Sequence, residues 1–75
     1  MAENFTYDFI GEHMVIAPGS AGWNLELNKI SWNKKAPKYD LRSWSADHQK
    51  MGKGLTLTAE ELVKLRDLLN TIEIG

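Results

Sequence analysis

Basic and aromatic side chains are interleaved in the middle third of the chain, between Trp32 and Lys53. Lysine and arginine follow the phosphates of a nucleic acid, while flat rings stack on unpaired bases and contribute ~1–3 kcal/mol per base with little preference for sequence. The pattern therefore predicts a surface for a single-stranded nucleic acid. Its candidate contact residues are Trp32, Lys34, Lys35, Lys38, Arg42, Trp44, Lys50 and Lys53.

The formal net charge of −1 hides a segregation of charge along the chain. Residues 1–28 carry four carboxylates and no Lys or Arg, residues 29–53 carry seven cations against two carboxylates, and residues 54–75 carry two cations against four carboxylates. A basic segment of this kind is typical of proteins that bind polyanions. A solvated lysine-rich face is the alternative interpretation.

The three tryptophans are expected in different surroundings. Trp23 belongs to an alternating apolar pattern and is expected in the core, whereas Trp32 is open between core packing and base stacking. Trp44 shares strand parity with Lys38 and Arg42, so its ring is expected on the exposed face, where it could stack on a base.

Sequence motifs for catalysis are absent. The chain has no Cys, no G-x-S-x-G motif and no G-x-x-x-x-G-K-[ST] phosphate loop. His13 and His48 stand 35 positions apart without a metal-ligand motif beside them, and are interpreted as a strand residue and a loop residue. We therefore expect no enzymatic activity, no metal and no cofactor.

Length and composition predict one small domain, residues 1–75, with a thin core. With no Cys to form a disulfide, self-association is the expected supplement to that core, so a homodimer is predicted. The apolar runs are far shorter than the ~18 residues of a membrane span, and no signal peptide is recognisable. A cytoplasmic location is expected, with the nucleoid as an option.

Two strand-like segments are expected in the first half of the chain. Residues 5–17 are apolar on both faces, and the breaker cluster 18–22 follows them as a hairpin loop. Residues 23–32 then alternate, but the phase slips near residues 28–29. Either a bulge there brings Trp32 into the core, or a straight strand leaves it on the polar face beside a basic loop.

The second half is expected to hold two further strands and a helix. The third strand starts after Pro37, a polar connector spans residues 45–51, and a short fourth strand covers residues 55–57. A capping box at residues 58–61 starts the helix. Its apolar stripe is the expected dimer interface, formed by Leu62, Leu65, Leu68, Leu69 and Ile72. The predicted fold is α+β, a four-stranded antiparallel sheet with one C-terminal helix laid across it (ββββα).

Three segments are informative together: Ile30-Ser31-Trp32-Asn33, Pro37-Lys38-Tyr39-Asp40-Leu41-Arg42 and Met51-Gly52-Lys53-Gly54-Leu55-Thr56-Leu57-Thr58. They resemble the YdbC-like bacterial branch of the family of the eukaryotic transcriptional coactivator called positive cofactor four. The similarity to the bacterial branch covers nearly the whole chain, and that to the eukaryotic coactivator covers about residues 27–72.

The resemblance implies a homodimer that binds single-stranded DNA on a curved sheet, with helices at the dimer interface. Carried over by position, Arg42 belongs to the D-[IL]-R strand, Trp44 is the aromatic after it, and Lys53 is the G-K-G lysine. Lys34 and Lys35 correspond to the basic loop, whose aromatic is missing here. The acidic and serine-rich tail of the eukaryotic coactivator is missing too, so the resemblance implies no coactivator role.

The leading hypothesis is therefore a non-enzymatic, largely sequence-independent single-stranded DNA-binding homodimer, in which Asp40 orients Arg42 or Lys38. Transcription, replication and repair all remain open as its setting. One alternative is a single-stranded RNA binder, because no residue identifies a group that reads the 2′-hydroxyl. Another is a protein–protein adaptor that uses exposed Trp rings.

Overall fold

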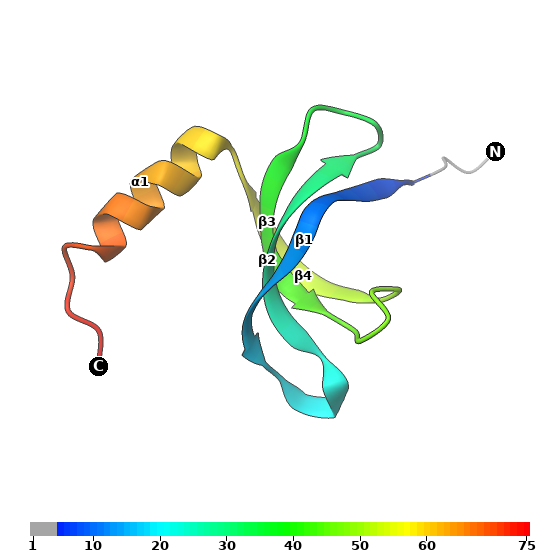
Figure 1. Ribbon diagram of the computed structural model, residues 1–75, viewed down its shortest axis with the longest axis horizontal. Helices are drawn as coiled ribbons and strands as arrows, with labels where there is room; N and C mark the ends of the chain where they lie inside the picture. The colour runs from blue at the N-terminus through cyan, green and yellow to red at the C-terminus, as the bar shows by residue number, and fades with distance from the viewer. Residues whose placement is uncertain (1–4) are drawn as a thin grey trace.

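A four-stranded antiparallel sheet followed by a helix makes up the structure, a computed structural model that describes residues 5–75 (Figure 1). The strands lie side by side in chain order, so each pairs with its neighbour in the sequence. The predicted ββββα order and α+β class are confirmed. The elements are β1 (Tyr7–Pro18), β2 (Asn24–Trp32), β3 (Lys38–Trp44), β4 (Met51–Leu57) and α1 (Ala59–Leu69).

The first two connections form where turn residues cluster. A 3₁₀ turn at Ser20–Gly22 closes the β1–β2 hairpin inside the predicted loop, and Gly22 has a φ of +80°, a conformation that favours glycine. β3 begins directly after Pro37, as predicted. Asn33 and Lys34 adopt φ values of 50° and 65°, which turn the chain between β2 and β3.

β2 runs straight through residues 28–29, so of the two alternatives the straight strand forms and the bulge does not. Its pairing with β3 runs without interruption from Asn24 opposite Trp44 to Ile30 opposite Lys38. In the β1–β2 pairing the extra residues lie on β1, where the register shifts after Ile10 and again after Val15. A further shift lies in the β3–β4 pairing, between Arg42 and Trp44. The extra residues on β1 let it stay paired with the straight β2, and they bend β1.

The straight β2 gives the sheet two distinct faces. We call one the aromatic face; it carries Glu26, Asn28, Ile30 and Trp32 of β2 and Lys38, Asp40, Arg42 and Trp44 of β3. We call the other the leucine face; it carries Leu25, Leu27, Leu41, Leu55 and Leu57. The fully buried side chains of the described residues, among them Ile30 and Trp44, all lie on the aromatic face. The best-packed part of the core is therefore on that side.

β4 starts at Met51, earlier than the predicted Leu55, and so includes the Gly52-Lys53-Gly54 segment. Glycine is depleted in strands, which is why composition suggested a connector there. Gly54 pairs with Arg42, and a Cβ added at position 54 would lie only 2.8 Å from Nε of Arg42. The missing side chain therefore lets the Arg42 side chain cross β4.

The capping box of α1 forms as predicted. The Glu61 amide donates to Oγ1 of Thr58 at 3.1 Å, and the Thr58 amide donates to Oε1 of Glu61 at 2.8 Å. The helix ends at Leu69, so Ile72 lies beyond it. No helix within residues 5–75 is long and apolar enough to cross a membrane.

α1 stands to one side of the sheet (Figure 1), and the expectation that it lies across the sheet is wrong. An apolar groove of about 490 Å³ separates the helix from the leucine face. Leu62, Leu65 and Leu69 line its helix side, and Ile16, Leu27, Leu41 and Leu57 line its sheet side. The apolar stripe of the helix is therefore only partly covered by its own chain.

Candidate nucleic-acid interface

Aromatic rings from β1 and β2 meet at one end of the aromatic face. The Trp32 ring centroid lies 5.7 Å from that of Phe5 and 5.7 Å from that of Tyr7. Trp32 is half-buried, while Phe5 is 58% exposed. Phe5 and Trp32 therefore offer aromatic surface to a ligand.

Two hydrogen bonds join the segments that carry the Phe5 and Trp32 rings. The Asn33 amide donates to the Thr6 carbonyl at 2.8 Å, and the Thr6 amide donates to Oδ1 of Asn33 at 2.9 Å. Because Thr6 follows Phe5 and Asn33 follows Trp32, these bonds fix the start of β1 beside the end of β2. The basic β2–β3 loop and the ring of Phe5 are thereby positioned together.

Trp44 is 0% exposed, so the expectation of an exposed Trp44 ring is wrong. Its parity with Lys38 and Arg42 is right, but that face is covered at this point. The strands bend strongly (Figure 1), and the ring of Phe9 in β1 reaches to 5.0 Å from the Trp44 ring although β2 lies between their strands. Tyr7 covers it too, at 5.5 Å. A ring enclosed in this way has no face free for a base.

Arg42 is held by Asp40, which confirms one of the two partners predicted for this carboxylate. Nε and Nη2 of Arg42 each donate to a different Asp40 oxygen at 2.7 Å. Nη1 contacts the Gly52 carbonyl at 3.4 Å and the sulfur of Met51 at 3.1 Å. The guanidinium also lies 5.1 Å from the Trp32 ring centroid, within cation–π range. Most of its five N–H donors are thus engaged within the protein.

The side chains of Trp32 and Arg42 line a shallow pocket of about 290 Å³ on the aromatic face, together with Phe5, Met51 and Thr56. Sequence reasoning missed Phe5, Met51 and Thr56. The period-two spacing of Phe5, Tyr7 and Phe9 was a usable signal, because it places three rings on one side of a strand.

The predicted lysines lie on two loops, the β2–β3 loop and the β3–β4 connector, and on strands β3 and β4 next to them. Lys34, Lys35, Lys38, Lys50 and Lys53 are all exposed. Lys34 pairs with Asp8 at 3.2 Å, but both side chains are more than half exposed, so the pair is weak and easily exchanged for a phosphate. Figure 1 shows both loops on the side of the sheet opposite to α1.

The β3–β4 connector is shaped by Asp47 and Ser45. The Gln49 amide donates to Oδ1 of Asp47 at 3.0 Å, and the Ser45 hydroxyl donates to the same oxygen at 2.8 Å. These bonds, that of the Gln49 amide first, lower the pKa of Asp47 from its ordinary 3.8. The Lys50 amide donates to the Ser45 hydroxyl oxygen at 3.0 Å, which fixes the backbone beneath Lys50.

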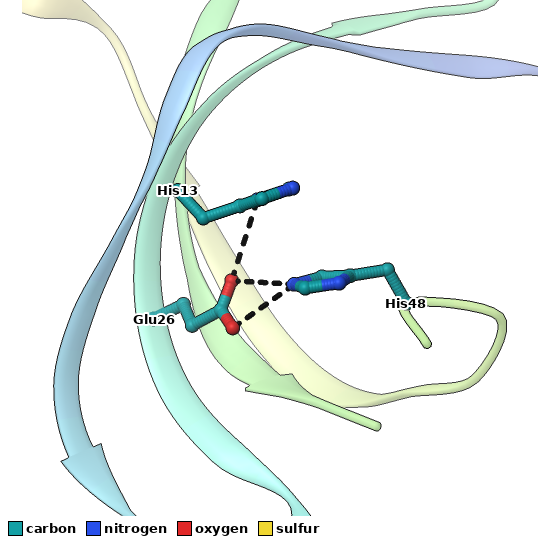
Figure 2. Close-up of side chains that lie close together, drawn as sticks. All are labelled: His13, Glu26 and His48. Atoms are coloured by element: carbon teal, nitrogen blue, oxygen red, sulfur yellow. Dashed lines mark hydrogen bonds and ion pairs between the residues drawn. The ribbon is translucent and has the colours of Figure 1, made fainter. Parts of the chain in front are cut away.

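Two histidines that the sequence left unrelated meet over one carboxylate (Figure 2). His13 of β1 and His48 of the β3–β4 connector stack with ring centroids 3.9 Å apart, and both contact Glu26 of β2. The bend of the sheet brings together segments 35 positions apart. No local spacing in the sequence could indicate this cluster.

The fold and the site define a small ββββα domain that carries an aromatic pocket between two lysine-bearing loops. The family model of Transcriptional Coactivator p15 (PC4) matches residues 20–68. An uncharacterised protein of Treponema pallidum (strain Nichols) is 47% identical over 72 residues, which are 96% of this chain and 85% of that protein. The chain belongs to the PC4 family, as the resemblance of its motifs predicted. The matched residues include Trp32 and Arg42 but neither β1 nor Phe5, which precedes it.

Proposed function

We propose that this protein binds single-stranded DNA without enzymatic action and with little dependence on base sequence. The observation that carries the proposal is the aromatic pocket of Phe5, Trp32 and Arg42, placed between two lysine-bearing loops. Membership in PC4, a family of non-enzymatic nucleic-acid-binding proteins, supports it. Unpaired bases need flat partners and a cationic path for the backbone, and this surface offers both.

The residues have different roles in this proposal. Trp32 and Phe5 stack on bases, because both present ring surface at the pocket. The phosphates follow the exposed lysines, namely Lys34, Lys35, Lys38, Lys50 and Lys53. Arg42 forms the floor of the pocket and keeps at most a minor contact with phosphate, because Asp40 already neutralises its charge. Trp44 supports the site from within the core.

The proposal includes a homodimer formed through α1. Leu68 is 57% exposed, and Leu69 and Ile72 are also exposed. The helix of a second copy would cover these residues and the groove of about 490 Å³ beside Leu62 and Leu65. An apolar stripe of this size left in water would favour association. The cytoplasm is the proposed location.

Fluorescence anisotropy with labelled oligo-dT tests the proposed function. We expect saturable binding of oligo-dT that a duplex of equal length competes for poorly, because paired bases are not available for stacking. A matched RNA oligomer decides between DNA and RNA as the preferred strand. If neither strand binds at low salt, the nucleic-acid proposal is wrong and the protein–protein adaptor becomes the better hypothesis.

A further inference from the structure

The cluster of His13, Glu26 and His48 has the hydrogen-bonding pattern of a site for a cation (Figure 2). Nε2 of His48 lies 3.0 Å from both carboxylate oxygens of Glu26. Nδ1 of His13 lies 3.6 Å from one of these oxygens and 3.1 Å from Oδ1 of Asn28. All of these oxygens are acceptors, so His48 directs an N–H at the Glu26 carboxylate and His13 directs one at Oδ1 of Asn28 beside it. Two imidazole nitrogens therefore lie within 3.6 Å of one carboxylate.

Glu26 accepts a hydrogen bond from Nδ2 of Asn28 at 2.9 Å, but this neutral donor brings no positive charge. Glu26 is 1% exposed, and a buried carboxylate is costly unless it is paired. Arg42 is its cross-strand neighbour, but that guanidinium is bound to Asp40. Within residues 5–75, the ion-pair partners of Glu26 are the two histidines. A divalent cation held by the same side chains would supply this positive charge.

We propose that His13, Glu26 and His48 bind one zinc-type divalent transition-metal ion. Their ligand atoms all lie within 4.8 Å of one another. Zinc bonds of ~2.0–2.2 Å in a tetrahedron set neighbouring ligand atoms about 3.3 Å apart, and the nitrogen–oxygen distances of 3.0 Å and 3.6 Å lie on either side of that value. Water completes the coordination.

Metal binding requires the two imidazoles to leave their stacked arrangement. The rings are nearly parallel, at 14°, whereas a metal ion lies in the plane of each ring that binds it. Both residues lie where the backbone is irregular. His13 lies between Ile10 and Met14, where the pairing of β1 with β2 shifts register, and His48 has a φ of 59° in the β3–β4 connector. Each ring can therefore tilt without breaking a ladder of the sheet.

The ligand set selects the class of metal. Two imidazoles with a single carboxylate suit zinc and its transition-metal neighbours, whereas Mg²⁺ and Ca²⁺ prefer oxygen ligands. A bound ion would tie β1, β2 and the β3–β4 connector together at one point. This inference is independent of the proposed DNA binding, although the connector also carries Lys50.

Competition with a chromophoric chelator tests the site, using untagged, metal-free protein and Zn²⁺. We expect one zinc ion per chain, and an affinity at least about tenfold weaker in His13→Gln and in His48→Gln. The matched control is Glu12→Gln, an exposed neighbour of His13 outside the cluster, which should keep the wild-type affinity. Equal zinc affinity in wild type and His13→Gln, or equal competition by Mg²⁺, would overturn the proposal.

A direct readout avoids dependence on how well the variants fold. Nitrogen NMR of the imidazole rings in the wild-type chain should show that Nδ1 of His13 and Nε2 of His48 both shift on addition of one equivalent of Zn²⁺. Glu12→Gln should give the same shifts. Ring signals that stay unchanged at saturating Zn²⁺ would exclude these histidines as ligands.

Discussion

Both carboxylate oxygens of Asp40 hold the guanidinium of Arg42, each through a nitrogen–oxygen distance of 2.7 Å. The two residues stand two positions apart on β3, on the same face of the sheet, and Asp40 is fully buried. Oγ1 of Thr56 on β4 donates to Asp40 as well, at 3.3 Å. The pair therefore fixes a cation beneath the aromatic pocket and joins β3 to β4.

Asp40→Asn should destabilise the protein strongly, because it leaves the largely buried Arg42 without its counter-charge. Losing one partner of a buried pair costs ~3–5 kcal/mol. Urea denaturation measures the change in the free energy of unfolding. Asp8→Asn is the control, since its pair with Lys34 is exposed and should cost less than ~1 kcal/mol. Equal losses in the two variants would contradict the structural importance of the pair.

Trp44→Ala should lower stability rather than act directly on DNA binding. The ring is enclosed by Tyr7 and Phe9, and truncation of a buried aromatic costs ~3–5 kcal/mol. Thermal unfolding followed by circular dichroism measures the loss. A Trp44→Ala variant with an unchanged melting temperature would mean that the aromatic face is open at this point.

Trp32→Ala should weaken binding to oligo-dT by ~1–3 kcal/mol, or roughly five-fold to a hundred-fold in Kd, because one base stack is lost. Phe5→Ala should have an effect of the same kind, since Phe5 shares the pocket. Anisotropy titrations at one fixed salt concentration give both values. If both variants bind like the wild type, the pocket is not the place where bases stack.

The affinity for single-stranded DNA should fall as salt rises, with a log–log slope of about −0.7 for each phosphate neutralised. Lys53→Ala should make the slope shallower by about 0.7, the contribution of one phosphate, because a single cation is removed from the proposed path. Lys64→Ala on α1 is the matched control and should leave the slope unchanged. A salt-independent affinity would favour recognition without phosphate contacts.

Leu68→Glu should shift the proposed dimer toward the monomer, because a carboxylate at an apolar interface is costly. Light scattering at micromolar concentration measures the mass. Lys64→Glu introduces the same charge outside the apolar stripe and should keep the mass of the dimer. A wild-type protein with the monomer mass would reject the dimer outright.

Asp47 should make the β3–β4 connector sensitive to acid. The pKa of Asp47 is lower in the folded state than in the unfolded state. Its contribution to stability is therefore complete at pH values above the pKa of the unfolded state, and it disappears as the pH falls through the pKa of the folded state. Asp47→Asn should therefore differ most from the wild type at neutral pH, and least in acid. Urea unfolding across a pH series checks this, and a constant difference would speak against it.

Alternation and capping patterns predicted the elements well, because those signals are local. The strand order, the Thr58 capping box and the contact of Asp40 with Arg42 all depend on residues close in sequence or on strand parity. Parity also assigned Trp44 to the correct face. It could not show that β1 bends over that face, because parity describes a strand and not what covers it.

The parts of the site that were missed depend on contacts between distant segments. The phase change in β2 left a bulge near residue 28 and a straight strand both open. In the structure β2 is straight and the extra residues lie on its partner β1, and a sequence cannot tell which of two paired strands holds them. Phe5 reaches the pocket through the contact of Thr6 with Asn33. His13 and His48 meet only because the sheet bends.

The neighbour-to-neighbour order of the strands has a consequence for how the chain folds. Each strand pair closes a short loop, so the hairpins can form early and at little entropic cost. The bond from the Tyr7 hydroxyl to the His48 carbonyl, at 3.2 Å, instead joins residues 41 positions apart. We expect the connector to close over the aromatic face last, so that water leaves the Trp44 ring only in the final step of folding.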